Sequence, residues 1–384
     1  MDTGGGSSNK ADDKSSETGG HHHHNHLFRQ VLRIMMLFTV VGVSCLVLYH
    51  SAYPFQFLPS SFYKPSSTST SHDSAPGNLS SPGKEDKLES VLKKAAMANK
   101  TVIITTLNEA WAAPNSILDL FLESFRIGNQ TSRLLNHLII VALDQKAYAR
   151  CLALHPHCYS LSTEGIDFSG EAYFMTGDYL KMMWTRIDFL HSVLKLGYDF
   201  VFTDADIMWF RDPFPRLYPD ADFQIACDNF RGNSYDLNNR PNGGFNYVKS
   251  NNRTVHFYNF WYTSRKTYPN LHDQDVLNKI KYDPFIRKIG LQIRFLDTAY
   301  FGGFCEPSKD FNLVCTMHAN CCYGLDNKVH DLSVMLEDWR KFMSLPADKR
   351  ASQRSSWSVP QNCSLSNFHP PDSHKKKAHQ GSNN

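Results

Sequence analysis

The stretch FVFTDADIMWF, residues 200–210, carries the clearest structural signal in this chain. Aromatic and β-branched residues predict a strand that ends at Thr203, and two aspartates follow it one residue apart. In an extended backbone residues i and i+2 point to the same side, so Asp204 and Asp206 are aimed at one point. Two carboxylates repel each other there unless a positive charge lies between them. Because oxygen ligands suit Mg²⁺ and Mn²⁺, the pair predicts a divalent metal site; a solvated turn is the alternative for an isolated Asp-x-Asp.

The sequence around this stretch alternates strand-like and helix-like segments. Continuous apolar runs at residues 101–106 and 137–143 are typical of parallel strands that are covered on both faces. Further segments fit strands at 199–203, 223–227 and 245–248, and helices at 114–127, 178–196, 255–262 and 273–280. We therefore predict one α/β domain over residues 97–345, with a mixed, mostly parallel sheet flanked by helices. In such sheets ligands bind beyond the carboxyl ends of the strands, which is where the acid pair stands.

An apolar run before this domain predicts a membrane anchor. Residues 34–49 carry no charge but are short against the ~20 residues of a typical span. Arg29 and Arg33 precede the run, so the positive-inside rule places the N-terminus in the cytosol and the rest of the chain in the lumen. We predict a retained signal anchor over 34–49, and a cleaved signal peptide is the alternative.

Three further segments have the composition of unfolded chain. Residues 1–33 predict a disordered cytosolic tail; the run His21–His24 could chelate metal or be an expression tag, and we assign it no function. Residues 50–96 are rich in Ser and Pro and predict a flexible stem, and residues 346–384 predict a disordered tail. The formal net charge of +3 comes with no clustered basic stripe, so we expect no nucleic-acid partner.

Cysteines and glycosylation sequons agree with a lumenal domain. Of nine cysteines, Cys45 lies in the predicted anchor, and the remaining eight allow up to four disulfides in an oxidising compartment. Cys151 and Cys158 form a plausible local pair, whereas the cluster of Cys305, Cys315, Cys321 and Cys322 fits either disulfides or a zinc site. The N-x-[ST] triplets all follow the anchor and begin at Asn78, Asn99, Asn129, Asn252 and Asn362.

Three segments together resemble a known family. They are FTDADIMWFRDP (202–213), NGGFNY (242–247) and HDQDVLN (272–278). Their combination resembles the plant nucleotide-diphospho-sugar transferases of glycosyltransferase family 77, over about residues 97–345. The resemblance implies a GT-A (Rossmann-like) fold, a UDP-sugar donor, Mn²⁺ or Mg²⁺ as the metal, and transfer with retention of anomeric configuration. It also implies a single-pass type II protein of the Golgi membrane with a lumenal catalytic domain and possible transferase partners there.

The resemblance assigns the metal and diphosphate ligands. Asp204 and Asp206 match the family's DxD motif, in which the first acid contacts ribose or metal and the second coordinates metal. His318 lies where related enzymes place a third metal ligand, and a core histidine is the alternative. Lys328 resembles a lysine beside the diphosphate, although this chain has Lys-Val-His where the relatives have Lys-Pro-Trp.

Other expected site residues follow from the same resemblance. Asp273 and Gln274 match residues beside the anomeric carbon and are the expected catalytic pair, although Asp273 could be a helix N-cap. The turn of Asn242, Gly243 and Gly244 is expected to line the sugar site or to be a plain tight turn. Fold position makes Thr105 and Thr106 the expected nucleotide-base contacts. Lys181 and Arg186 lie on the helix before the DxD strand, where we expect surface charges; contact of either with phosphate or sugar is the alternative.

The function expected from these features is transfer of a sugar, such as the pentoses xylose or arabinose, from a UDP-sugar to a hydroxyl of a cell-wall polysaccharide or glycoprotein. A phosphatase of the haloacid dehalogenase type also places Asp-x-Asp after a strand. That motif requires Thr or Val where this chain has Met208, and its strand normally opens the domain. The remaining alternative is a non-catalytic lumenal protein that binds sugars or partners on a transferase fold.

Overall fold

The computed structural model describes residues 36, 84–161, 175–352 and 356–363. The predicted anchor at 34–49 lies outside the described residues except for Met36, as do the predicted tail at 1–33 and residues 50–83 of the predicted stem. Among the described residues, no helix is both long and apolar enough to cross a bilayer. The anchor therefore stays a prediction from the sequence.

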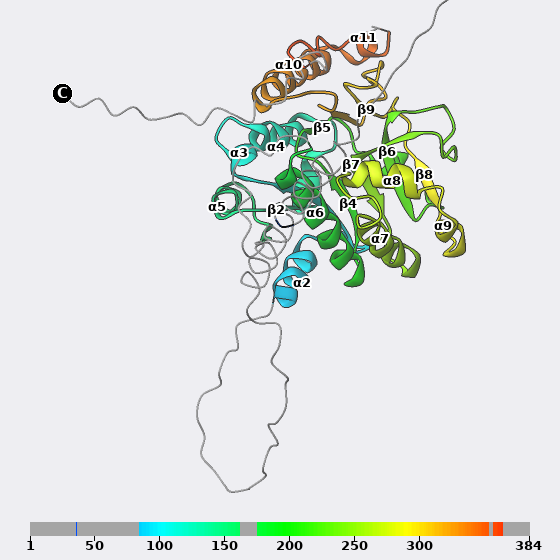
Figure 1. Ribbon diagram of the computed structural model, residues 1–384. Helices are drawn as coiled ribbons and strands as arrows, with labels where there is room; N and C mark the ends of the chain where they lie inside the picture. Colours follow the sequence, from blue (N-terminus) through cyan, green and yellow to red (C-terminus); the bar gives the residue numbers. More distant parts are fainter. Residues whose placement is uncertain (1–35, 37–83, 162–174, 353–355, 364–384) are drawn as a thin grey trace, which may run out of the picture. The chain divides into compact units, whose positions relative to one another are not determined.

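The centre of the domain is a seven-stranded sheet with the order β3-β2-β1-β4-β7-β6-β8 (Figure 1). Every neighbouring pair is parallel except the two that involve β7, which runs antiparallel to β4 and β6. The sheet is therefore mixed and mostly parallel, as predicted. Its strands are β1 (Thr101–Leu107), β2 (Leu138–Ala142), β3 (Cys158–Ser160), β4 (Asp199–Thr203), β6 (Phe223–Asn229), β7 (Arg240–Val248) and β8 (Ile293–Phe295).

A second sheet of three strands has the order β5-β10-β9. Its strands are β5 (Ile207–Trp209), β9 (Phe301–Gly303) and β10 (Thr316–His318). The DxD stretch links the two sheets, because β4 ends just before Asp204 and β5 begins just after Asp206. In β10, His318 is paired with Ile207, which brings the histidine beside the acid pair.

Helices cover both faces of the large sheet. Helices α4 and α10 lie on one face of the sheet, and α2, α6, α7 and α8 lie on the other (Figure 1). Their buried side chains belong to two separate hydrophobic clusters. This explains the continuous apolar strands, since alternate residues of each strand enter different cores. The helices are α2 (Lys84–Ala95), α3 (Glu109–Ala112), α4 (Ile117–Ile127), α5 (Gln145–Leu154), α6 (Gly177–Lys195), α7 (Asn252–Ser264), α8 (Asp273–Ile280), α9 (Pro284–Lys288), α10 (Leu325–Ser344) and α11 (Ala347–Ser352), with 3-10 turns at Ser132–His137 and Phe214–Arg216.

The helix before the DxD strand shows how local sequence fixes an element. Thr176 caps α6, because its side chain accepts a hydrogen bond from the backbone N–H of Tyr179. After the helix ends, Gly197 adopts a φ of 80°, a left-handed conformation that glycine takes without strain. The chain thereby reverses and enters β4 at Asp199.

The packed region is longer at both ends than the predicted range of 97–345. Helix α2 lies in the predicted flexible stem and buries Leu88, Leu92 and Ala95. Beyond residue 345, α11 forms, and Val359 and Cys363 are buried in segments that we predicted as a disordered tail. A few buried apolar side chains are enough to attach each of these otherwise polar segments to the domain. The average composition of a segment does not reveal such isolated contacts.

Six cysteines form disulfides in the described part of the chain. Cys151 is bonded to Cys158, which confirms the predicted local pair, and the other bonds are Cys305–Cys321 and Cys322–Cys363. The zinc alternative is wrong, because three of the four cysteines proposed for it are consumed in disulfides. The fourth, Cys315, is buried with a free thiol, as is Cys227.

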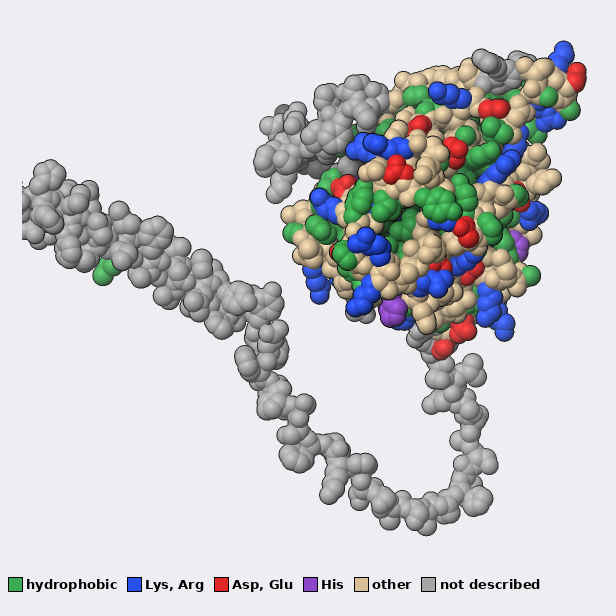
Figure 2. Space-filling model, turned by 90° about the vertical axis from the view of Figure 1, so that its right-hand side faces the viewer, with side chains coloured by type: hydrophobic (Ala, Val, Ile, Leu, Met, Phe, Trp, Pro, Cys, Tyr) green, Lys and Arg blue, Asp and Glu red, His purple; other side chains and the backbone are tan. Residues whose placement is uncertain are grey.

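One face of the molecule is shown in Figure 2. Lys and Arg side chains on that face are interspersed with acidic and hydrophobic side chains rather than gathered in one stripe.

Candidate functional site

A cavity of about 410 Å³ lies beside the acid pair, where β1 and β4 end. Its lining comes from many elements: the segment after β1, the first half of α6, the DxD stretch, the start of β7, the start of α8 and the segment that leads into α10. Because β7 runs antiparallel to β4, its first residues meet the carboxyl end of β4. The topology thus places the cavity where open α/β sheets bind ligands.

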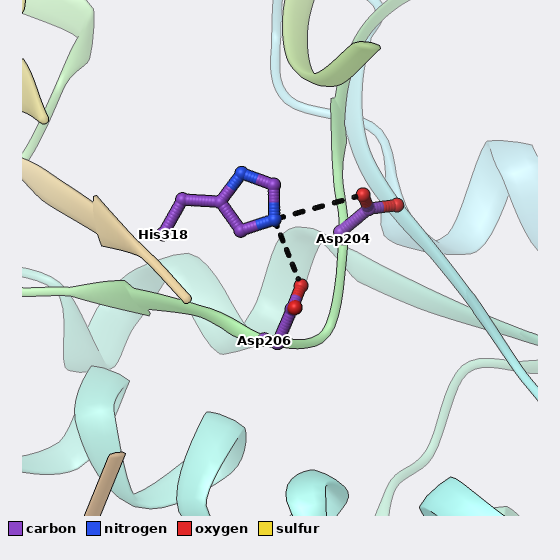
Figure 3. Close-up of side chains that lie close together, drawn as sticks. All are labelled: Asp204, Asp206 and His318. Carbon is purple, nitrogen blue, oxygen red and sulfur yellow. Dashed lines mark ion pairs between the residues drawn. The ribbon is translucent and has the colours of Figure 1, made fainter. Parts of the chain in front are cut away.

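Asp204, Asp206 and His318 converge at this cavity (Figure 3). His318 Nε2 lies 3.1 Å from Asp206 Oδ1 and 3.9 Å from Asp204 Oδ2. Hydrogen bonds of the main chain hold the acids in place, since Asp204 N donates to Gly244 O and Ala319 N donates to Asp206 O. The structure therefore brings together the three residues that we predicted as metal ligands.

The donor set fits a divalent cation. Two carboxylates and one imidazole are ligands that suit Mn²⁺. Asp206 Oδ1 is buried and makes no aligned hydrogen bond with any described residue, although the ring nitrogen of His318 lies near it. A buried oxygen without a hydrogen-bond donor is costly, and a metal ion at this point would satisfy it.

Lys328 lies against the same carboxylate. Its Nζ is 2.5 Å from Asp206 Oδ2, and its side chain also passes over the ring of Trp111. Burial alone would raise the pKa of Asp206, but the charge of Lys328 opposes burial and holds this pKa below its usual range. Asp206 is therefore ionised, as a metal ligand must be, and Lys328 is not a solvated surface lysine.

Arg186 joins the first acid of the pair to Asp273. Its Nη1 is 2.9 Å from Asp204 Oδ1 and its Nη2 is 2.5 Å from Asp273 Oδ2, with the guanidinium almost fully buried. Our prediction of a surface charge is wrong for Arg186, whereas Lys181 is exposed and lies near Asp178 as expected. A signal was present in the sequence, because Arg186 stands three residues after Met183 and four before Leu190, on the buried side of the helix.

The two partners of Arg186 differ in proton affinity. Burial raises the pKa of Asp204, the charge of Arg186 opposes this, and the neighbouring Asp206 charge adds to it. Burial also acts on Asp273, but Arg186 outweighs it and lowers the pKa of this carboxyl to about 2. Asp273 is thus a firmly ionised group.

The start of α8 supplies the predicted catalytic pair. The N-cap is His272, whose side chain accepts a hydrogen bond from the N–H of Gln274, so the alternative role of Asp273 as an N-cap is wrong. Asp273 instead points to Arg186, and Gln274 Oε1 accepts a hydrogen bond from Gly243 N at 2.8 Å. Both residues line the cavity.

Asp228 also lines the cavity, and sequence analysis missed it. Its carboxylate accepts hydrogen bonds from the side-chain amides of Asn242, Gln274 and Asn320. The sequence held a signal that resembles the one at Asp204, because Asp228 directly follows the apolar residues of a predicted strand.

Thr105 and Thr106 behave differently from each other. Thr106 lines the cavity, whereas Thr105 is fully buried and is not among the described residues that line it. Neighbouring residues of a strand point to opposite faces, so the two side chains cannot share one site. The prediction therefore fits Thr106 alone.

Comparisons with known proteins agree with this geometry. A family model described as nucleotide-diphospho-sugar transferase matches residues 133–332. An uncharacterized protein of Arabidopsis thaliana is 55% identical over 278 residues, which cover 72% of this chain and 73% of that protein. The beta-arabinofuranosyltransferase RAY1 of the same plant is 24% identical over 173 residues, which cover 44% of this chain and 30% of that protein.

Among solved structures, the apo form of mouse xyloside xylosyltransferase 1 is similar at 14% identity and a TM-score of 0.35, covering 58% of this chain and 98% of that one. The family model spans more than half of the 384 residues and includes the acid pair, Arg186, Asp273 and His318. This chain therefore belongs to the nucleotide-diphospho-sugar transferase family and is a glycosyltransferase.

Proposed function

We propose that this protein transfers a sugar, a pentose such as arabinose or xylose, from a UDP-sugar to a hydroxyl of a cell-wall polysaccharide or glycoprotein. The observation that carries the proposal is the convergence of Asp204, Asp206 and His318 with Lys328 in one cavity. The similarity to the beta-arabinofuranosyltransferase RAY1 supports a pentose donor. The mixed sheet with the acid pair at its ligand edge supports a GT-A fold.

Asp204, Asp206 and His318 would hold Mn²⁺ or Mg²⁺ in this enzyme. A bound divalent ion supplies positive charge that neutralises the diphosphate as it leaves. Lys328 adds a second positive charge on the same side of the cavity, where the leaving group's charge develops. Arg186 holds Asp204 through Oδ1, which leaves Oδ2 as the oxygen nearer to His318.

Asp273 is a poor proton acceptor, since its pKa of about 2 lies far from neutral pH. Both oxygens of Asp273 also face cationic or imidazole groups, namely Arg186 and His272. These observations make Asp273 unsuited to be the general base, and the proposed retaining route instead has the departing phosphate oxygen take the proton of the acceptor hydroxyl. Asp273 and Gln274 would then position the donor near the acceptor.

The proposal includes residence in the Golgi lumen behind the anchor at 34–49, with the transferase partners found there. Three disulfides support an oxidising compartment. The sequon residues Asn99, Asn129, Asn252 and Asn362 are all exposed, which supports access for glycosylation. Digestion of the native protein with an N-glycosidase tests this part, and an unchanged mass would contradict it.

A donor screen tests the activity. We expect Mn²⁺-dependent release of UDP from a UDP-pentose, and a fall of at least about 100-fold in Asp204→Ala and Asp206→Ala. Asp188→Asn, an exposed change on α6, serves as the control and should keep full activity. Glycan binding without UDP release from any donor would instead support the non-catalytic alternative.

A further inference from the structure

Asp228 lies at the centre of three side-chain amides. Its Oδ1 accepts hydrogen bonds from Asn242 Nδ2 and Asn320 Nδ2, both at 2.8 Å, and its Oδ2 accepts one from Gln274 Nε2 at 2.9 Å. The three amides come from β7, the segment after β10 and α8, which are far apart in the sequence. One carboxylate thus links three parts of the cavity.

The opposite end of each amide is fixed by the main chain. Asn242 Oδ1 accepts a hydrogen bond from Gly244 N, Gln274 Oε1 accepts one from Gly243 N, and Asn320 Oδ1 accepts one from Cys305 N. A backbone N–H can only donate, so each amide must turn its oxygen to the main chain and its NH₂ to Asp228. A carboxylate, with acceptors on both oxygens, satisfies all three amides at once.

The orientation of Asn242 has a consequence for His318. Asn242 Oδ1 lies 3.1 Å from His318 Nδ1 as well as 2.9 Å from Gly244 N. Because this oxygen can only accept, the ring must carry a proton on Nδ1. The nitrogen that faces Asp206 is then Nε2, and its lone pair is available to a metal ion.

We propose that Asp228 is a positioning residue that, through Asn242, fixes the tautomer of His318 and so selects Nε2 as the metal-binding nitrogen. The inference rests on the proposed metal site. Asp228 does not touch the imidazole itself; it holds the amide whose oxygen does. The arrangement resembles the carboxylate–histidine–metal pattern, with an amide inserted between carboxylate and histidine.

The same geometry predicts different effects for two substitutions of Asp228. In Asp228→Asn, the remaining oxygen can still serve Asn242 and Asn320, while its new NH₂ faces the NH₂ of Gln274. The hydrogen bond to Asn242, and through it the contact with His318, is then kept, whereas the hydrogen bond to Gln274 is lost. In Asp228→Ala no acceptor remains, so Asn242 is released and the tautomer of His318 is no longer fixed.

Mn²⁺ binding to the full-length protein tests the proposal. Affinity is measured by isothermal titration calorimetry. Coordination of imidazole is measured by electron spin echo envelope modulation, in which a nitrogen bound to Mn²⁺ modulates the echo. We expect Asp228→Ala and Asn242→Ala each to weaken Mn²⁺ binding about 10- to 100-fold and to reduce this modulation. Asp228→Asn should bind Mn²⁺ as wild type does while releasing UDP more slowly, as Gln274→Ala does.

Coupling between the two positions provides a second criterion. If Asp228 acts through Asn242, the double variant Asp228→Ala/Asn242→Ala binds Mn²⁺ no more weakly than Asn242→Ala alone. The signal that remains in His318→Ala comes from other histidines, including His21–His24, and serves as the background. Asp188→Asn is the control for the loss of a carboxylate elsewhere in the protein. Thermal melting shows which variants fold, and Asn242→Ala carries the test where Asp228→Ala does not fold.

The outcomes separate this inference from the proposed function. If wild type and Asp206→Ala bind Mn²⁺ equally, the metal site itself is wrong and the inference falls with it. If wild type binds more tightly than Asp206→Ala but Asn242→Ala binds as wild type does with an unchanged nitrogen signal, the positioning role alone is overturned. Additive losses in the double variant overturn it too.

Discussion

Gly243 and Gly244 are neighbours with different surroundings. A Cβ atom at position 244 would lie 2.6 Å from His318 Cε1 and 2.7 Å from Asp204 Oδ2. A Cβ at position 243 would meet Asp273 Oδ2 at 3.5 Å, which is an ordinary contact. Glycine is thus needed at 244 for space beside Asp204 and His318, whereas at 243 it is not.

This contrast gives a matched pair of variants. We expect Gly244→Ala to displace His318 and Asp204 and to lower UDP release about 100-fold, since a misplacement near 1 Å has effects of that size. Gly243→Ala should keep activity within about 3-fold of wild type, because only ordinary contacts are added. Equal activity of the two variants would show that position 244 tolerates a side chain.

Arg186 and Asp273 determine how the fold responds to acid. The pKa of Asp273 is lowered to about 2 from 3.8, so the ionised group stabilises the fold above about pH 4, and this stabilisation is lost as the pH falls through about 2. In Arg186→Met, the buried Asp273 and the partly buried Asp204 lose their cation. We expect a loss of about 3–5 kcal/mol at neutral pH and unfolding that begins at a higher pH than in wild type.

Thermal melting between pH 2 and pH 7 measures this effect. Lys181→Met removes an exposed charge from the same helix and should leave the curve unchanged. If the melting temperatures of wild type and Arg186→Met fall in parallel as the pH is lowered, Arg186 does not determine the pH at which the protein unfolds in acid.

At the scale of elements, the C-terminal strap of residues 356–363 holds helix α10. Asp331 of α10 is fully buried and accepts hydrogen bonds from the backbone N–H groups of Gln361, Asn362 and Cys363. Burial acts to raise the pKa of Asp331, but these amides outweigh it and hold the pKa below its usual range. Because Lys328 stands one turn before Asp331, the strap also steadies the lysine that contacts Asp206.

We therefore expect a substitution of Asp331 to lower both the stability of the fold and the rate of UDP release. Asp331→Asn keeps the shape but provides one accepting oxygen instead of two, which costs about 2 kcal/mol. For a domain of this size that is a fall of about 4 °C in Tm, and UDP release should fall with it. Asp326→Asn, an exposed change on the same helix, is the control and should alter neither. An unchanged Tm for Asp331→Asn would show that the strap does not depend on this carboxylate.

The whole domain begins at α2, before the predicted boundary at 97. Leu88 and Leu92 are buried against the sheet, and each buried leucine contributes about 2 kcal/mol. We expect a fragment that starts at residue 84 to melt cooperatively and one that starts at residue 97 to have a melting temperature several degrees lower. Fragments with equal melting temperatures would mean that α2 adds nothing to the fold.

The sequence predicted the sheet and the acid pair because both depend on local periodicity. Strands read as apolar runs, and residues i and i+2 share a side whatever surrounds them. His318 and Lys328 were reached only through the resemblance, since nothing near them in the sequence indicates that they meet Asp206. The roles of Arg186 and Asp228 depend on partners from other elements. Thr105 differs from Thr106 because adjacent residues of β1 point to opposite faces of the sheet.

Cys321 and Cys322 are adjacent residues of the cavity lining. Cys321 forms its disulfide with a cysteine earlier in the chain, whereas Cys322 forms its disulfide with a later one. Cys305 precedes its partner by 16 residues, whereas Cys363 follows its partner by 41 and lies at the end of the described residues. During synthesis the first bond needs no residue beyond Cys321, whereas the second cannot form until the chain has been extended to Cys363. The side of the cavity that Cys321 and Cys322 line thus depends on a residue 41 positions further along the chain.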